Sequence, residues 1–265
     1  MSAHPSPHIT FERVAKTFAG ADGPIEVVRP FDLDVARGEL IAFLGPSGCG
    51  KTTLMRMVGG LETPSAGRIL LGGEPLGSPD RRRGMVFQSY SSFPWLTVAG
   101  NVAFGLRYRS DLSASEKRER VAHYLGVVGL TEFADAWPTR ISGGMRQRVA
   151  IARTLAAGSE VLLMDEPFGA LDAQRREALQ LELRRIQEAD HKTIVFVTHD
   201  VEEAAFLADR VIVFTRRPAA VLAEVDVNAV IGTHRDLATR DSETFFRLRN
   251  TLLAHVRATA EDHHG

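Results

Sequence analysis

Short apolar runs alternate with longer amphipathic stretches along this chain. The runs at 40–44, 161–164, 193–198 and 211–214 are continuous and rich in apolar residues such as valine, isoleucine and leucine. Runs of this kind are typical of strands that helices cover on both faces. The pattern therefore predicts an α/β fold with a mostly parallel sheet.

Residues 9–36 follow a different pattern, in which apolar and polar residues alternate more regularly. Gly20, Gly23 and Pro24 interrupt this alternation. Alternation predicts strands with one exposed face, joined here by a turn, so we expect an antiparallel flank beside the parallel core. Residues 1–8 lack a basic start followed by an apolar run, so we expect a disordered tail there and not a secretion signal.

The strand pattern stops between about residues 90 and 158, where charged helical segments take over. Ser113 followed by Glu116 is typical of a capping box, and Ser142 stands where a second helix would begin. This stretch predicts a helical subdomain, inserted into an α/β domain that spans residues 9–240.

The last part of the chain, residues 241–265, predicts a C-terminal helix and tail. Phe245, Leu248, Leu252 and Val256 recur there at helical spacing. One face of this helix is therefore expected to pack on the core of the α/β domain.

The composition is that of an ordinary folded protein. Of 265 residues, 44% are hydrophobic and 25% are charged, which excludes disorder as the dominant state. The formal net charge of -1 gives no overall attraction to nucleic acid, and we interpret the arginines at 81–83 as a solvated turn. The longest apolar runs fall far short of the ~20 residues that a membrane-spanning helix needs.

Residues 45–52 fit the phosphate-binding pattern G-x-x-x-x-G-K-[ST], between a predicted strand and a predicted helix. The loop and the residue after it are Gly45, Pro46, Ser47, Gly48, Cys49, Gly50, Lys51, Thr52 and Thr53. Glycines let backbone N–H groups converge on phosphate oxygens, and the helix N-terminus adds its positive dipole end. We expect Lys51 to bind the β- and γ-phosphates of ATP and the Thr52 hydroxyl to bind Mg²⁺.

Two other predicted strands end in polar residues. Asp165 and Glu166 directly follow one apolar run, and His199 follows another. We interpret Asp165 as a ligand of Mg²⁺, Glu166 as the catalytic group that polarises the attacking water, and His199 as a catalytic hydrogen-bond partner of the γ-phosphate. The alternatives are plain surface charge for the two carboxylates and a structural role for the histidine.

The run that precedes the acidic strand is Ile141, Ser142, Gly143, Gly144, Met145, Arg146, Gln147 and Arg148. Together with the phosphate-binding loop, it resembles the signature of the ATP-binding cassette (ABC) ATPases, and the resemblance extends from Ile9 to Phe214. It implies that the serine and the two glycines contact the γ-phosphate held by a second subunit of a homodimer. Ile141 and Met145 depart from the usual leucine and glutamine, and Met145 removes a polar contact.

The same resemblance implies roles for three more residues. Phe18 is similar to the aromatic residue that stacks on adenine, and Gln88 to the catalytic glutamine that contacts Mg²⁺ and the attacking water. Asp172 is similar to the acidic end of a loop that crosses the dimer interface. A core aromatic on an early strand is the alternative for Phe18.

Aromatic residues gather between 89 and 98, directly after Gln88. One interpretation is a surface that docks a helix of a partner protein, with Trp95 as an anchor. The other is core packing of the helical subdomain. In the ABC family, this region receives a coupling helix from the membrane-spanning subunit.

Segments 87–106 and 142–148 look like those of the nitrate, sulfonate and taurine importer group. The resemblance implies an ATPase subunit whose ATP-driven dimer closure powers import. It also implies integral membrane permease subunits, a place at the cytoplasmic face of the inner membrane, and an extracytoplasmic solute-binding protein. The alternatives are a soluble ABC ATPase that acts on ribosomes or nucleic acid, and a nucleotide-binding switch, which Glu166 and His199 disfavour.

Overall fold

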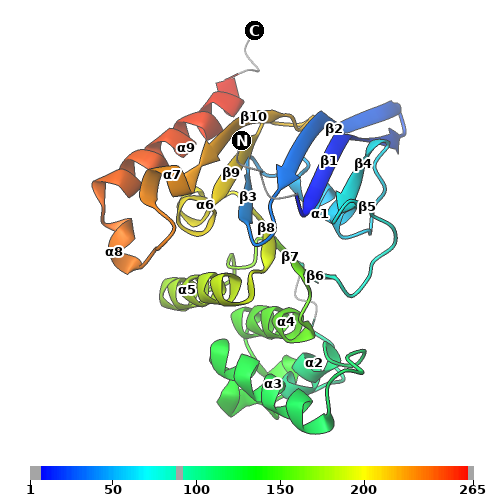
Figure 1. The fold of residues 1–265 in the computed structure, drawn as a ribbon, viewed down its shortest axis with the longest axis vertical. Helices are drawn as coiled ribbons and strands as arrows, with labels where there is room; N and C mark the ends of the chain where they lie inside the picture. Colours follow the sequence, from blue (N-terminus) through cyan, green and yellow to red (C-terminus); the bar gives the residue numbers. More distant parts are fainter. Residues whose placement is uncertain (1–6, 88–91, 262–265) are drawn as a thin grey trace. The chain divides into compact units, whose positions relative to one another are not determined.

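The computed structural model describes residues 7–87 and 92–261, which form two compact units (Figure 1). Unit 1 is built from the residues up to Asp80 and those from Gln187 onward, and unit 2 is Arg81–Ile186. Both units combine strands with helices, which confirms the predicted α/β class. The predicted division into 9–240 and 241–265 stays a prediction.

The first sheet of unit 1 is antiparallel. Its strands are β1 (Ile9–Gly20), β2 (Gly23–Val35), β4 (Ala66–Leu71) and β5 (Glu74–Pro75), in the order β2-β1-β4-β5. Gly20 pairs with Gly23 across the turn that joins β1 to β2. The predicted antiparallel flank and its turn are therefore confirmed.

The second sheet of unit 1 has a parallel core. The strands of this sheet that lie in unit 1 are β3 (Leu40–Leu44), β8 (Thr193–Thr198), β9 (Arg210–Phe214) and β10 (Val221–Asp226). β3 pairs in parallel with both β8 and β9, and β10 is antiparallel to β9. Leu44 lies opposite Thr198, so β3 and β8 end at the same edge of the sheet.

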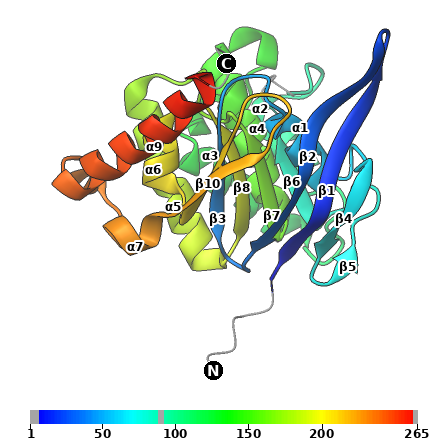
Figure 2. The same ribbon diagram turned by 90° about the horizontal axis from the view of Figure 1, so that it is seen from above.

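The helices of unit 1 are α1 (Lys51–Val58), α6 (Val201–Leu207), α7 (Val227–Ile231), α8 (Leu237–Arg240) and α9 (Glu243–Glu261). α9 lies along α6 and also contacts α7 and β9 (Figure 2). Phe245, Leu248 and Leu252 are buried, which confirms the predicted C-terminal amphipathic helix.

Four phenylalanines connect the two sheets of unit 1 in one core. Phe11 on β1 and Phe31 on β2 have ring centroids 5.4 Å apart, and Phe43 on β3 and Phe214 on β9 are 5.3 Å apart. Phe31 and Phe214 approach to 5.9 Å and so bridge the sheets. Burial of each ring contributes roughly 1.5–3 kcal/mol, so the cluster stabilises the strands that carry the phosphate-binding loop.

Unit 2 contains two parallel strands and the two helices predicted to begin near Ser113 and Ser142. Its elements are β6 (Arg83–Val86), α2 (Val98–Phe104), α3 (Ala114–Val127), the 3-10 helices Thr131–Phe133 and Pro138–Arg140, α4 (Gly143–Ala157) and β7 (Val161–Asp165), followed by α5 (Ala173–Asp190). α2, α3 and α4 pack on one another. No helix among residues 7–87 and 92–261 has the length and apolarity that a bilayer crossing requires.

The caps of two helices in unit 2 agree with the sequence pattern. Ser113 and Glu116 form a complete capping box at the start of α3. Ser142 caps α4 by accepting a hydrogen bond from the backbone N–H of Met145. Because Ser142 belongs to the signature run, the same hydroxyl that fixes the start of α4 stands at the position proposed to contact phosphate.

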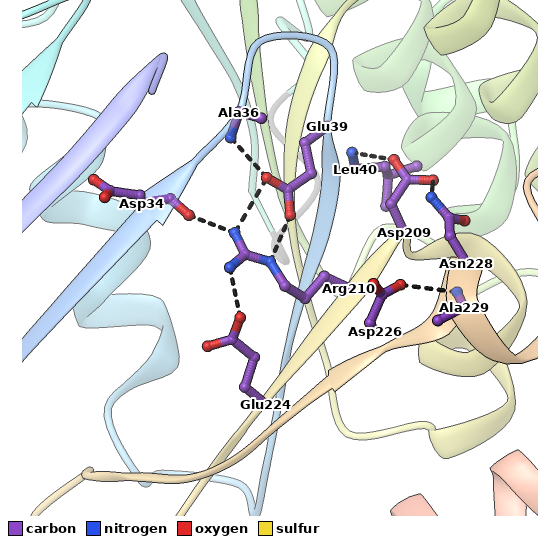
Figure 3. A network of polar contacts seen from close by, with 10 residues as sticks. All are labelled: Asp34, Ala36, Glu39, Leu40, Asp209, Arg210, Glu224, Asp226, Asn228 and Ala229. Atoms are coloured by element: carbon purple, nitrogen blue, oxygen red, sulfur yellow. Dashed lines mark hydrogen bonds and ion pairs between the residues drawn. The ribbon is translucent and has the colours of Figure 1, made fainter. Parts of the chain in front are cut away.

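A polar network joins four segments of unit 1 at the amino ends of β3 and β9 (Figure 3). Arg210 donates to Oε1 of Glu39 and to Oε1 of Glu224, each at 2.7 Å, and also to the carbonyl of Asp34. Burial opposes the charged form of Arg210, but the bonds to Glu39 and Glu224 outweigh it and raise the pKa of the guanidinium. The network therefore ties β2, β3, β9 and β10 together.

Replacing Arg210 with glutamine is expected to lower the Tm by about 4–8 °C. Glu39 is 12% exposed and loses its cation, at a cost of about 2 kcal/mol, between the costs for exposed and fully buried pairs. Calorimetry measures the shift. Arg68→Gln removes an exposed ion pair with Glu12 and is the matched control. Equal shifts in the two variants would contradict a special contribution from the Arg210 network.

Candidate active site

The phosphate-binding loop leaves the buried strand β3 and ends at the start of α1, as the sequence predicts. A Cβ on Gly45 would lie 2.9 Å from the carbonyl oxygen of Phe214, so only glycine fits beside β9. Gly50 has φ +127, a conformation that side chains rarely adopt. These two glycines therefore set the path of the loop, and the exposed Ser47 and Gly48 lie at its tip.

Lys51 is the first residue of α1 and is 4% exposed. Its Nζ donates to the carbonyl oxygens of Gly45 at 2.7 Å and Pro46 at 2.8 Å, and lies 3.8 Å from Sγ of Cys49. The ammonium group is thus folded into the loop. Cys49 is 1% exposed, and its backbone N–H donates to the carbonyl of Pro46 at 3.4 Å.

The start of α1 suits an anion. The first N–H groups of a helix have no partner within the helix, and they carry the positive end of its dipole. The first turn of α1 contains no acidic residue. Thr52 and Thr53 in that turn are exposed and half-buried, respectively. The loop therefore fits the phosphates of ATP, with Lys51 as the nearby cation.

His199 directly follows β8 and is exposed. Because Leu44 and Thr198 are register partners in parallel strands, the phosphate-binding loop and His199 leave the sheet at the same edge. Unit 1 thus brings together the phosphate-binding loop and the histidine that the sequence assigned to the γ-phosphate.

Phe18 lies on β1 with 37% of its surface exposed. The Nζ of Lys16 stands 4.6 Å from the centre of the Phe18 ring. Lys16 is held in place by hydrogen bonds to Glu62 Oε1 at 2.6 Å and to the carbonyl of Thr63 at 2.7 Å. The core interpretation of Phe18 is therefore wrong, and an exposed ring face suits base stacking.

Asp165 ends β7 and is 3% exposed, whereas Glu166 is half-buried. Glu166 has φ 46, and among the described non-glycine residues only Arg13 and His191 share a positive φ. Such strain persists where the surrounding structure imposes it, often at functional sites. Gln88, the other predicted catalytic and Mg²⁺-binding residue, lies outside the described residues.

The signature residues occupy the start of α4 in unit 2. Ser142 is exposed and accepts from the Met145 N–H at 3.2 Å, and Ile141 is buried as the apolar anchor. A Cβ on Gly144 would lie 2.9 Å from the carbonyl of Ala170. Gly144 is therefore needed for packing against the loop at 169–172, a structural role that sequence reasoning missed and that stands beside its predicted contact with phosphate.

Asp172 is exposed at the end of that loop and caps the start of α5. Its Oδ1 accepts from the Arg175 N–H at 3.0 Å. Asp172 therefore has a structural role as a helix cap, in addition to the role at the dimer interface that the family resemblance implies. Gly143, between Ser142 and Gly144, is half-buried in the first turn of α4.

The oxygen donors predicted for Mg²⁺ are chemically suitable. Thr52 supplies an exposed hydroxyl in unit 1, and Asp165 supplies a buried carboxylate in unit 2. Mg²⁺ is bound in nucleotide sites through one or two protein oxygens together with phosphates and waters. In the part of the chain that the structure describes, no three His, Cys, Asp or Glu side chains are grouped so that they could hold a metal ion.

A buried asparagine organises the aromatic segment of unit 2. Asn101 is fully buried and accepts from the Phe93 N–H, while its Nδ2 donates to the carbonyls of Phe93, Leu96 and Thr97. Sequence reasoning did not assign this role. The signal was an amide side chain inside an apolar helical segment, which requires partners when it is buried.

Trp95 is 68% exposed on this segment, so the core interpretation of the aromatic stretch does not hold for this residue. Its ring lies 5.4 Å from Phe93, which in turn packs 4.5 Å from Phe104. The guanidinium of Arg153 stands 4.9 Å from the Phe93 ring. Phe93 therefore anchors the loop on unit 2, and Trp95 extends from it as an exposed aromatic surface.

Comparison with known proteins gives consistent matches. The family model described as ABC transporter matches residues 28–169. A putative ATP-binding protein of Brucella abortus is 46% identical over 246 residues, covering 93% of this chain and 92% of the relative. The nitrate import ATP-binding protein NrtD of Synechococcus elongatus is 47% identical over 216 residues, covering 81% and 79% of the two chains.

Two further matches are a transport protein and a solved structure. The bicarbonate transport ATP-binding protein CmpD of Synechocystis is 42% identical over 247 residues, covering 92% of this chain and 87% of the relative. Among solved structures, a dimer of the ATP-binding cassette MJ0796 in a post-hydrolysis state with ADP and Pi has a TM-score of 0.76. It is 32% identical to this chain and covers 83% of it and 98% of the solved chain.

Proposed function

The chain belongs to the ABC transporter family and is an ATPase, and on this basis we propose that it powers import of a small solute through a membrane complex. The observation that carries the proposal is that one chain presents two helix starts suited to phosphate. One is the loop before α1, and the other is the signature at the start of α4. Each can bind the phosphates of ATP.

The two phosphate-binding helix starts act in different copies of the chain. The loop of one copy binds ATP, and Ser142, Gly143 and Gly144 of the other contact its γ-phosphate. A ligand shifts a conformational equilibrium only through contacts that differ between the states. The signature contacts exist only in the closed dimer, so ATP favours closure and loss of the γ-phosphate favours opening. The dimeric ADP and Pi state of the solved relative supports this assignment.

The proposed catalytic residues are Glu166, His199 and Gln88. Glu166 polarises the attacking water, and His199 and Gln88 hydrogen-bond the γ-phosphate and the water. Thr52, Gln88 and Asp165 hold Mg²⁺, which neutralises charge on the β- and γ-phosphates when it is bound. Phe18 stacks on the adenine, and Asp172 lies at the dimer interface.

The names of the relatives narrow the solute. NrtD is a nitrate import protein and CmpD a bicarbonate transport protein, and each aligns over most of this chain. We assign this chain to the same group, with nitrate, bicarbonate, sulfonate, taurine or a similar small solute as cargo. Permease subunits hold it at the cytoplasmic face of the membrane, and an extracytoplasmic binding protein delivers the solute.

ATP-dependent uptake by the reconstituted complex tests this function. The chain is assembled with its permease and solute-binding protein in liposomes, with ATP on the side of the ATPase. Labelled nitrate, bicarbonate and taurine are offered in parallel. Accumulation of one of these solutes that requires ATP supports the proposal. ATP hydrolysis without uptake, together with stable binding to ribosomes, would instead favour the soluble alternative.

Replacing Trp95 with alanine is expected to weaken assembly with the permease. Truncation of an exposed tryptophan anchor typically costs about 2–4 kcal/mol of binding free energy. Hydrolysis by the isolated subunit and its Tm should change little, because Trp95 is 68% exposed. Co-purification with the permease, ATP hydrolysis by the isolated subunit and calorimetry measure these effects. Trp137, which is 44% exposed, gives the matched control Trp137→Ala. Unfolding of the Trp95 variant, or equal effects of both, would contradict the docking role.

A further inference from the structure

His199 lies between two residues joined by a buried hydroxyl. Thr198 is 1% exposed, and its Oγ1 donates to Oε2 of Glu203 at 2.9 Å and accepts from the N–H of Asp200 at 2.9 Å. The bond to Glu203 is buried and the bond to Asp200 is partly buried; a hydrogen bond typically contributes about 0.5–1.5 kcal/mol, and one to a charged group about 1.5–3 kcal/mol. The backbone on both sides of His199 is therefore fixed by one side chain.

The helix that follows His199 is short. α6 has seven residues, and a helix of that length is unstable in water by itself. Asp200 caps it by accepting from the N–H groups of Glu202 at 2.8 Å and Glu203 at 3.2 Å. This cap fixes the first turn only, so the direction of α6 depends on tertiary contacts along its length.

Arg235 supplies such contacts at the far end of α6. It is 5% exposed, and its Nη1 donates to three consecutive carbonyls, those of Phe206 at 3.3 Å, Leu207 at 3.3 Å and Ala208 at 2.6 Å. The last carbonyls of a helix have no partner within it, and a cation there also interacts favourably with the dipole. Arg235 thus satisfies the C-terminal end of α6 from a segment later in the chain.

α9 contacts the other end of the same helix. Nη1 of Arg249 donates to Oε1 of Glu202 in the first turn of α6 at 2.8 Å. Arg240, at the end of α8, places its guanidinium 4.1 Å from the ring centre of Phe206. The segment from Arg235 onward therefore contacts α6 near both of its ends. Its helix α9 runs beside α6 (Figure 2).

We propose that Thr198, Arg235 and Arg249 are positioning residues for His199. They act through α6 and the backbone beside it, and the proposal rests on the role of His199 in the proposed function. Hydrolysis then depends on the C-terminal segment, which lies beyond the part of the chain matched by the family model. A residue that only stabilised the fold would change the amount of active protein and not the rate at which each molecule hydrolyses bound ATP.

The first test is Thr198→Val, which keeps the shape of the side chain and removes the hydroxyl. In the full-length chain, kcat for ATP hydrolysis is expected to fall about ten- to a hundredfold. The KM for ATP is expected to stay unchanged, because the phosphate-binding loop is untouched. Thr198→Ser retains the hydroxyl and should restore kcat. Equal losses in both variants, or a raised KM with normal kcat, would overturn the proposal.

A double-mutant cycle with His199→Ala asks whether Thr198 acts through the histidine. If it does, Thr198→Val should cause almost no further loss when His199 is already alanine. A full additional loss would overturn the proposal while leaving the role of His199 intact. Undiminished hydrolysis in His199→Ala alone would instead remove that role from the proposed function, and the positioning proposal with it.

A surface exchange keeps the proposal testable if Thr198→Val does not fold. Arg249 and Glu202 side chains are 33% and 58% exposed, so changes there leave the core intact. Arg249→Glu places like charges together and is expected to lower kcat about two- to fivefold. Adding Glu202→Arg restores opposite charges and should recover the rate. A single variant with normal kcat, or a pair without recovery, would count against positioning by α9.

Discussion

Replacing Glu166 with glutamine is expected to lower steady-state ATP hydrolysis about a hundredfold or more while ATP stays bound. Removing a general base typically costs about 10²–10⁴ in rate. The amide has nearly the same shape as the carboxylate, so the strained backbone at φ 46 and its surroundings should persist. Bound ATP that is not cleaved keeps the signature contacts in place, so the variant should also accumulate as a dimer.

Two measurements check the Glu166 variant. Phosphate release gives the hydrolysis rate, and light scattering during gel filtration with ATP and Mg²⁺ gives the mass of the species. Glu119→Gln removes an exposed carboxylate on α3 and serves as the control. It should hydrolyse ATP at the normal rate and form no persistent dimer. Undiminished hydrolysis in Glu166→Gln would contradict the assignment of this residue as the base.

The features that could be predicted from the sequence have causes local in the chain. The strands at 40–44 and 193–198 are buried at every position. A continuous apolar run of that length favours a buried strand. The capping box of Ser113 and Glu116 needs only four consecutive residues. The phosphate-binding loop also follows from a local pattern between a strand and a helix.

The features that sequence reasoning missed depend on residues far apart in the chain. Gly144 must be glycine because the carbonyl of Ala170 approaches it, and neither residue indicates the other. Arg235 binds the end of α6 although two strands and a helix separate them in the sequence. Such contacts form only once the chain has folded, so the periodicity and spacing of residues in the sequence do not predict them.

The aromatic residues show the same limit in another form. The sequence did not decide whether Phe18 and Trp95 lie in the core or on the surface, because large aromatic side chains occur in both places. In the structure both are exposed, Phe18 beside Lys16 and Trp95 beside the anchored Phe93. What decides between core and surface is whether a second element covers the ring, and that is set by the arrangement of elements in space.

Replacing Lys51 with alanine is expected to reduce the affinity for ATP by about two to four powers of ten. Hydrogen bonds to charged groups contribute about 1.5–3 kcal/mol each, and the ammonium is assigned to both the β- and γ-phosphates. Isothermal titration calorimetry with ATP and Mg²⁺ measures the loss. Lys117→Ala removes the same charge from α3 and should bind ATP with normal affinity.

The effect on the protein without nucleotide is expected to be small. Lys51 is 4% exposed, and its Nζ contacts two loop carbonyls and a thiol. Burial of the ammonium group costs desolvation free energy, and alanine does not have this cost. The Tm should therefore change little while nucleotide binding is lost, which separates a missing phosphate contact from a collapsed loop. Equal ATP affinity in the Lys51 and Lys117 variants would contradict the phosphate role, because the helix start would then hold ATP without its cation.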